Sequence, residues 1–370
     1  MAADLVVGID IGMTGTGIAH KSKWDGKPTA LRWGKDIKIP TRLFYCDRHQ
    51  PPKLVGWGLE VPDDSAKPFT TREWFKVDFG NKDADQTQVE SLYTDFLGCL
   101  YQELRFRQFT PKILRGKSFE ESTINFLFSV PATWDPALVS NFKQLISNAG
   151  FDHVKDHTIH VAMTEPQAVA AFQMCRSQSS DQTKDGDNVL IVDAGGGTTD
   201  FCLLKIQDKF HGTSEVHKSS QAIEIQPVSA CGIGSVNIDK DFEDLVKEHV
   251  ESHGGILTKS PEQVAWHVRD SDDYRDCKHK FGTEGFDDLT FTIPFQKSNL
   301  GEPASLPRIE PFSLIATTMA SLFDTQINRI KEEIKAFLKQ LEKRRDTVDT
   351  SRNYIIAGGL GSSPYFKDRR

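Results

Sequence analysis

The feature that most constrains the fold is a short apolar run that ends at an aspartate and then breaks into small residues and glycine. Residues 5–17 read LVVGIDIGMTGTG, with Asp10 near the end of the run. The apolar, largely β-branched residues predict a buried strand. The glycines predict a tight turn whose bare backbone can approach a ligand. A second apolar run starts at Gly17, so we predict a β-hairpin.

The same layout occurs again in the second half of the chain. Residues 189–200 read VLIVDAGGGTTD, and aligning Asp193 with Asp10 also places Gly195 on Gly12. A single glycine turn after a strand is usually an ordinary hairpin. Two copies with matched aspartates indicate two related halves that face one ligand.

Length and composition narrow the class of protein. With 370 residues the chain can form two domains, and its 38% hydrophobic and 26% charged residues are those of a folded protein. The net charge of −7 argues against nucleic acid as the main partner. No apolar run approaches the roughly 20 residues of a membrane helix. Six cysteines without a Cys-x-x-Cys pair argue against zinc and a disulfide framework, and they fit a reducing, cytoplasmic location.

Helical and strand patterns alternate along the chain. The polar stretch 177–187 is the best candidate boundary between the halves. Asp135 and Pro136 are typical of an N-cap and a first helical turn. Helices are expected over 87–106, 136–150, 166–172, 237–249 and 312–344, and strands over 124–130, 158–163, 222–228, 289–293 and 353–357.

Two further glycine-rich turns indicate a split nucleotide site. They are Gly-Ile-Gly-Ser from Gly232 and the stretch 358–364, which follows a predicted strand. Backbone N–H groups of such turns can cradle phosphate oxygens and pack against a ribose or base. Two strand-end aspartates are expected to hold a hydrated magnesium ion, because Mg²⁺ keeps most of its waters. Neither a complete P-loop nor a dinucleotide fingerprint is present.

These motifs, in this order, resemble the ATPase domain of the seventy-kilodalton heat-shock chaperone family, and most closely a divergent, fungal-type branch. The matching segments are 8–15, 129–133, 164–168, 193–200, 232–235 and 357–363. The resemblance implies an α/β, actin-like (ribonuclease H-like) ATPase fold with two lobes, each a mixed sheet flanked by helices. Lobe I would span 1–186, with its core at 1–37 and 107–186 and a peripheral subdomain at 38–106. Lobe II would span 187–370, with its core at 187–236 and 305–370 and a peripheral subdomain at 237–304.

The resemblance also implies a role for each matching residue. Asp10 and Asp193 would hold the magnesium ion through water, Glu165 would help Asp193 to orient the attacking water, and Lys76 would be the catalytic lysine. ATP or ADP would be bound by Gly12, Met13, Thr14, Gly15, Gly195, Gly196, Gly197, Thr198, Gly232, Lys278, Gly358, Gly359 and Ser362. The alternatives are a solvated surface position for Lys76 and an N-cap role for Glu165 before Pro166.

Three departures from the family pattern affect the expected activity. Met13 stands where the family usually has a threonine, so a hydroxyl near the γ-phosphate is missing and hydrolysis is expected to be very slow. His279 stands in place of the arginine of the adenine-clamping helix. The chain ends a few residues past the adenosine motif. We therefore expect either a fragment or a protein that does not grip clients in the familiar way.

Three functions remain open from the sequence. The first is a slow Mg-ATPase whose lobes close around the nucleotide, acting with protein clients or co-chaperones. The second is a nucleotide-gated binding module with little or no hydrolysis, which Met13 and His279 favour. The third is a small-molecule kinase on the same fold, with Asp135 as the base.

Overall fold

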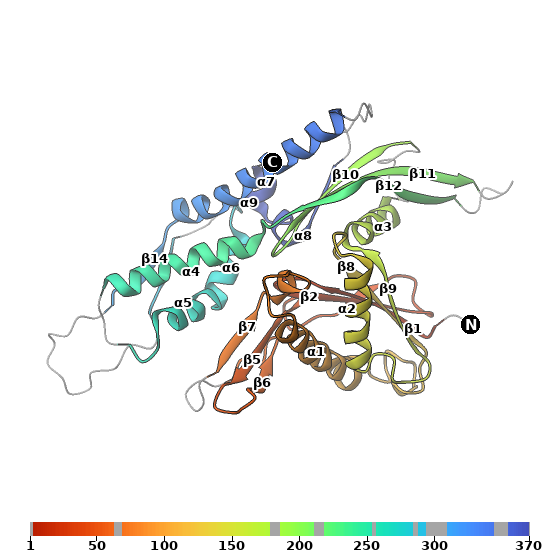
Figure 1. The fold of residues 1–370 in the computed structure, drawn as a ribbon, viewed down its shortest axis with the longest axis horizontal. Coiled ribbons are helices and arrows are strands. Elements are labelled where there is room, and N and C mark those ends of the chain that lie inside the picture. Colours follow the sequence, from red (N-terminus) through yellow and green to blue (C-terminus); the bar gives the residue numbers. More distant parts are fainter. Residues whose placement is uncertain are drawn as a thin grey trace. The chain divides into compact units, whose positions relative to one another are not determined.

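Figure 1 shows the fold in a computed structural model of the chain. The chain divides into two compact units: the first unit comprises 1–187 with 204–228, and the second unit comprises 188–203 with 229–370. The structure describes residues 3–62, 69–177, 186–210, 218–253, 257–283, 288–293, 309–343 and 354–369. Most of the expected boundary at 177–187 lies outside these residues.

The first unit is built on a mixed sheet. Strands β1 (Leu5–Ile11) and β2 (Gly15–Ser22) are antiparallel, with Asp10 opposite Gly17, which confirms the first predicted hairpin. Alternate residues of β1 are buried, so Asp10 lies on the less buried side of a strand anchored by its apolar neighbours. Parallel strands β8 (Ile124–Val130) and β9 (His157–Thr164) extend the sheet beyond β1, and β3 (Thr29–Ala30) and β4 (Lys38–Pro40) both pair with β2.

Helices and an aromatic core support this sheet. Phe126 and Phe128 of β8 pack edge-on against Phe151, and Phe128 also contacts Phe142 of α2. Helix α2 begins where predicted, because the Asp135 carboxylate accepts the Leu138 N–H at 2.8 Å. The helical segments are η1 (Phe75–Asp78), α1 (Gln86–Glu103), the π-helical turn η2 (Leu104–Gln108), α2 (Pro136–Asn148) and α3 (Glu165–Ser177), and a small sheet contains β5 (Arg42–Cys46), β6 (Lys53–Trp57) and β7 (Thr70–Glu73).

A second sheet carries the repeated glycine motif. Its strand order is β12 (Lys218–Cys231), β11 (Thr199–Phe210), β10 (Asn188–Ala194) and β15 (Tyr354–Ala357). Strands β10 and β15 are parallel, with Asp193 opposite Ala357. Because these strands run side by side, the segments that follow them leave the sheet at the same edge. The mixed α/β class predicted from the sequence is confirmed.

Helices of the second unit enclose a separate core. In Figure 1, the long helix α7 (Ala316–Lys343) runs beside α4 (Ser235–Ser252), and buried residues of both belong to one apolar cluster. The remaining elements are α5 (Pro261–Arg269), α6 (Asp272–Lys280), β13 (Leu289–Phe291), β14 (Phe312–Leu314), α8 (Gly358–Gly361) and α9 (Pro364–Asp368). No described helix has the length and apolar character needed to span a membrane.

Two secondary-structure predictions in this unit are wrong. The helix expected over 312–344 begins only at Ala316, whose N–H donates to the Asp288 carboxylate at 2.8 Å. Phe312–Leu314 instead forms a strand that pairs with β13, with its two buried residues alternating about one exposed residue. The stretch from Gly358 was expected to be a turn, but Gly358–Gly361 forms a single helical turn.

Candidate functional site

The glycine turn of the first unit is closed by its own backbone. A side chain on Gly12 would meet the Gly15 carbonyl oxygen at 2.6 Å, so the turn requires glycine at this position. The Thr41 N–H donates to the Thr14 carbonyl oxygen at 3.2 Å and ties the turn to the neighbouring segment. Met13 is buried, whereas Thr14 is exposed. Thr14 is therefore the residue of this turn whose side chain faces solvent.

Asp10 is held by two side chains from other strands. Lys38 Nζ of β4 donates to Asp10 Oδ2 at 3.1 Å, and Ser129 Oγ of β8 lies 3.5 Å from Asp10 Oδ1. The partial burial of Asp10 opposes its ionisation, but the charges of Lys38 and Lys76 and the two hydrogen bonds outweigh it and lower its pKa. Asp10 is therefore an ionised carboxylate that already has a cation beside it. Sequence reasoning did not identify Lys38.

Two predicted site residues of the first unit, Lys76 and Glu165, form an ion pair. Their side chains lie 89 residues apart in sequence, yet Lys76 Nζ donates to Glu165 Oε1 at 2.5 Å. The side chains are only 13% and 16% exposed, so the interpretation of Lys76 as a solvated surface lysine is wrong. Such a partly buried, hydrogen-bonded pair fixes both groups in place.

Two local features position this pair. Thr164 and Gln167 cap α3 reciprocally, since the Gln167 N–H donates to Thr164 Oγ1 at 3.4 Å and the Thr164 N–H donates to Gln167 Oε1 at 3.0 Å. Glu165 is therefore not the N-cap, and its carboxylate is available to Lys76. Trp74, just before η1, has a left-handed backbone (φ 64°), which is uncommon outside glycine and recurs at functional sites.

In the second unit, the repeated glycine turn packs directly on the start of α4. The Gly195 N–H donates to the Thr198 carbonyl oxygen at 2.9 Å and closes the turn. The Val236 N–H of α4 donates to the Gly196 carbonyl oxygen at 2.8 Å. A side chain on Gly234 would lie 2.3 Å from that same oxygen and 2.8 Å from the Gly197 nitrogen. Glycine at this position is what allows the two motifs to touch.

The adenosine motif of the resemblance packs on Asp193. Gly358 has φ +83°, and a side chain on it would lie 2.2 Å from the Ala194 carbonyl oxygen and 2.5 Å from Asp193 Oδ1. Gly359 and Ser362 are exposed, and an added side chain at Gly359 would meet open space. The parallel pairing of β10 with β15 brings the stretch from Gly358 beside the Gly195–Thr198 turn, and the contact of Gly234 with Gly196 adds the motif at 232–235 to the same strand end.

Lys278 has a different environment from the one expected of an adenine-binding residue. Its Nζ lies 2.7 Å from both carboxylate oxygens of Asp239 and donates to the Ser235 carbonyl oxygen at 3.0 Å. The side chain is 12% exposed. Burial lowers the pKa of Lys278, opposed by Asp239. These contacts fasten α6 to the first two turns of α4. Gly232, by contrast, is exposed and has open space at its Cβ position.

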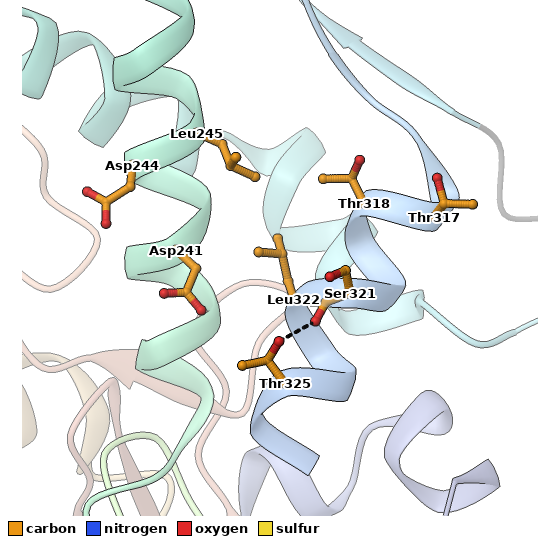
Figure 2. Close-up of a pocket in the computed structure, with 8 residues that line it drawn as sticks. All are labelled: Asp241, Asp244, Leu245, Thr317, Thr318, Ser321, Leu322 and Thr325. Atoms are coloured by element: carbon orange, nitrogen blue, oxygen red, sulfur yellow. Dashed lines mark hydrogen bonds between the residues drawn. The ribbon is translucent and has the colours of Figure 1, made fainter. Parts of the chain in front are cut away.

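A pocket of the second unit lies between α4 and α7, away from these motifs. Figure 2 shows its lining, which combines carboxylates of α4 with hydroxyls of α7. It has a volume of about 460 Å³. Its residues are Asp241, Asp244, Leu245, Thr317, Thr318, Ser321, Leu322 and Thr325. Asp241 already accepts a hydrogen bond from Gln326 Nε2 at 3.1 Å. No residue predicted to bind a nucleotide lines this pocket, so it is not the candidate site.

Comparison with known proteins gives a distant relationship. No protein-family model matches the chain. It is 23% identical over 382 residues to the chaperone protein DnaK of Guillardia theta, and 21% identical over 376 residues to that of Prochlorococcus marinus (strain MIT 9515). These alignments cover 98% and 97% of the chain but 55% and 53% of the relatives. The chain thus spans about half the length of the curated relatives it matches. The matches support a relationship to the DnaK chaperones over nearly the whole chain.

Proposed function

We propose that this chain binds ATP and ADP as the nucleotide-binding part of a chaperone-like protein, and that it hydrolyses ATP slowly. The observation that carries this proposal is the pairing of Lys76 with Glu165 at 2.5 Å. The resemblance assigns these two residues to catalysis from motifs far apart in the sequence. A chance match of two short motifs gives no reason for their side chains to meet.

The proposed phosphate-binding groups are backbone amides of the two glycine turns. Gly12–Gly15 would supply them from the first unit and Gly195–Thr198 from the second. Each turn keeps glycine where a Cβ would strike a backbone oxygen or crowd the turn, which is the requirement for close backbone approach to a phosphate. Closure of two lobes around the nucleotide is the conformational step that this function requires.

The proposed chemistry uses the charged pair. Glu165 accepts one hydrogen bond from Lys76 and keeps lone pairs that can orient a water molecule. Lys76 can stabilise the charge that develops on the transferring phosphoryl group. Met13 supplies no hydroxyl to this step, and its side chain is buried. This last observation favours the second candidate, a nucleotide-gated binding module with little turnover.

A magnesium ion bound through Asp10 does not fit the residues of the first unit. Lys38 Nζ already stands 3.1 Å from Asp10 Oδ2, and Lys76 adds a second positive charge. We therefore assign no step to magnesium. Of the two roles that the resemblance implies for Asp193, we keep the orientation of the attacking water, and its magnesium role stays a prediction.

Asp135, the candidate base of the kinase alternative, is the N-cap of α2. Its carboxylate accepts the Leu138 N–H at 2.8 Å, which accounts for this residue without a catalytic role. Protein clients, co-chaperones and a cytoplasmic location remain predictions from the resemblance.

Equilibrium titration of the purified chain with ATP, ADP and GTP, followed by single-turnover hydrolysis, tests the proposal. We expect saturable binding of ATP and ADP, and phosphate release that Lys76→Met abolishes while Lys335→Met, on the exposed face of α7, leaves it unchanged. Binding without phosphate release above background would refute the ATPase and leave the nucleotide-gated binding module as the remaining candidate. No binding of any of the three nucleotides would refute the proposed function.

A further inference from the structure

Lys38 of β4 reaches Asp10 of β1 across strand β2, because β2 has glycine at the positions that lie between the two side chains. In β2, Gly17 lies opposite Asp10 of β1 on one side and opposite Lys38 of β4 on the other. An added Cβ at Gly17 would meet Lys38 Cε at 3.4 Å, and one at Gly15 would meet Lys38 Cβ at 3.3 Å. The lysine stem therefore lies over the two glycines, and its ammonium group projects to the end of β1.

The charges gathered here balance without a metal. Asp10 and Glu165 contribute two negative charges, and Lys38 and Lys76 contribute two positive charges. A divalent cation at Asp10 would have to approach an ammonium group 3.1 Å from the same carboxylate. An ammonium group on a flexible stem can neutralise phosphate oxygens as a metal does, since Lys binds phosphate as a point charge.

The pair is also open to a ligand. The side chains of Lys38 and Asp10 are 49% and 43% exposed. The Lys38 ammonium group has three N–H donors, so it can hold Asp10 and still donate to a phosphate oxygen. The pair of Lys76 with Glu165 is more buried and has a shorter contact. Of the two lysines, Lys38 is therefore the one that an incoming phosphate can reach more easily.

We propose that Lys38 is a nucleotide-binding residue whose ammonium group stays beside Asp10 and also donates to a phosphate oxygen, so that nucleotide binding depends only weakly on magnesium. The proposal rests on the proposed function, because it requires that ATP or ADP binds beside the Gly12–Gly15 turn. Its basis is that Lys38, Gly15 and Gly17 of β2, and Asp10 lie together at one strand end.

The test is a calorimetric titration with ATP, in magnesium and in excess EDTA. Four proteins are compared: wild type, Lys38→Met, Lys38→Arg and Lys21→Met. Methionine keeps most of the stem and removes the charge, whereas arginine keeps the charge. Lys21 is exposed on β2, the strand that Lys38 crosses, and serves as the matched control.

For the wild type, we expect the Kd to change by less than about threefold when magnesium is removed. In EDTA, Lys38→Met should weaken binding about 10- to 150-fold, the loss of one charge-assisted hydrogen bond. Lys38→Arg should retain most of the affinity, and Lys21→Met should match the wild type.

Two results would overturn the inference while leaving the proposed function intact. One is a wild-type Kd that rises more than about tenfold in EDTA. The other is equal loss of binding in Lys38→Met and Lys38→Arg, which would assign the effect to packing rather than charge. A wild type that binds no ATP in either buffer would instead refute the proposed function, and the inference with it.

Discussion

The charged residues of the first unit and the glycine motifs of the second unit are placed by different physical means. In the first unit, the predicted residues Asp10, Glu165 and Lys76, together with Lys38, are held by charge pairs between side chains from separate elements. In the second unit, the three glycine motifs are held by backbone packed against backbone, with hydrogen bonds from α4 to the Gly195–Thr198 turn. We therefore expect the charged residues of the first unit, rather than the glycine motifs of the second, to adjust to a ligand. Charge pairs can exchange partners, whereas close backbone contacts allow almost no displacement.

The largest effect is expected where backbone packing is tightest. Gly358→Ala places a Cβ within 2.5 Å of Asp193 Oδ1 and the Ala194 carbonyl oxygen, at a φ of +83°. Overpacking and left-handed strain together should lower the free energy of unfolding of the second unit by about 3–4 kcal/mol. Chemical denaturation measures it. Gly359→Ala is the matched control, because its Cβ meets open space and its effect should stay within about 1 kcal/mol. Equal effects at the two positions would contradict the packing argument.

The charged pair of the first unit should give the next largest effect. Glu165→Gln leaves the Lys76 ammonium group partly buried without its anion, and we expect a loss of about 2 kcal/mol in stability. Adding Lys76→Met should recover part of that loss while ATP hydrolysis stays abolished. A double-mutant cycle by denaturation, with hydrolysis assayed in parallel, checks both outcomes. Additive losses would mean that the two side chains are not coupled.

A control pair for the double-mutant cycle of Lys76 and Glu165 lies on the surface of α7. Lys335 Nζ lies 2.7 Å from Glu332 Oε1, with both side chains more than half exposed. Because solvent screens this pair, its coupling energy should stay below about 0.5 kcal/mol.

Acid should weaken the first unit through Asp4. Its side chain is 3% exposed and accepts hydrogen bonds from Lys117 at 2.7 Å, Lys23 at 2.5 Å and the Thr123 N–H at 3.1 Å. These contacts lower the pKa of Asp4 well below its ordinary value of 3.8. Asp4 therefore stabilises the fold above about pH 4, and this contribution falls as the pH drops toward the folded-state pKa. Asp4→Asn should cost about 1–2 kcal/mol at pH 7 and flatten the loss of stability measured between pH 5 and pH 2. An unchanged acid profile would contradict this role.

The smallest changes in stability are expected for two buried tyrosines, one in each unit. Tyr274 donates from its hydroxyl to Asp239 Oδ1 at 3.0 Å, whereas the buried hydroxyl of Tyr93 has no partner among the described residues. Tyr274→Phe should therefore cost about 1 kcal/mol, and Tyr93→Phe should be neutral or slightly stabilising. Thermal unfolding of the two variants measures the difference. A clear loss in Tyr93→Phe would show that its hydroxyl is satisfied in solution, for example by a buried water.

Local sequence patterns predicted much of the fold. The β1–β2 hairpin follows from an apolar run broken by glycine, and the start of α2 follows from Asp135 and Pro136. Prediction was wrong where an element was too short for its period to show. Phe312–Leu314 has three residues, which fit the apolar spacing of the helix that follows as well as they fit a strand. Only the partner strand β13 distinguishes the two.

The candidate site was predictable in its motifs but not in its contacts. Lys76 could be named as a candidate, but only the structure places it against Glu165. Lys38 carries no motif of its own. The one signal for it in the sequence is the alternation of Gly15 and Gly17 in β2, which leaves a neighbouring long side chain room to cross the strand.

The sequence by itself determined the β1–β2 hairpin, the turn that requires Gly12 and the carboxylates that stand near the strand ends. Those properties depend on neighbours within a few residues, and local propensity and steric limits act over that range. Glycine at Gly234 and Gly358 is required instead by tertiary contacts with Gly196 and Ala194. Tertiary structure alone decided which charges meet. Lys38 reaches Asp10 and Lys76 reaches Glu165 because strand pairing and helix packing bring together side chains 28 and 89 residues apart. An ion pair between such distant residues exists only after the chain has folded.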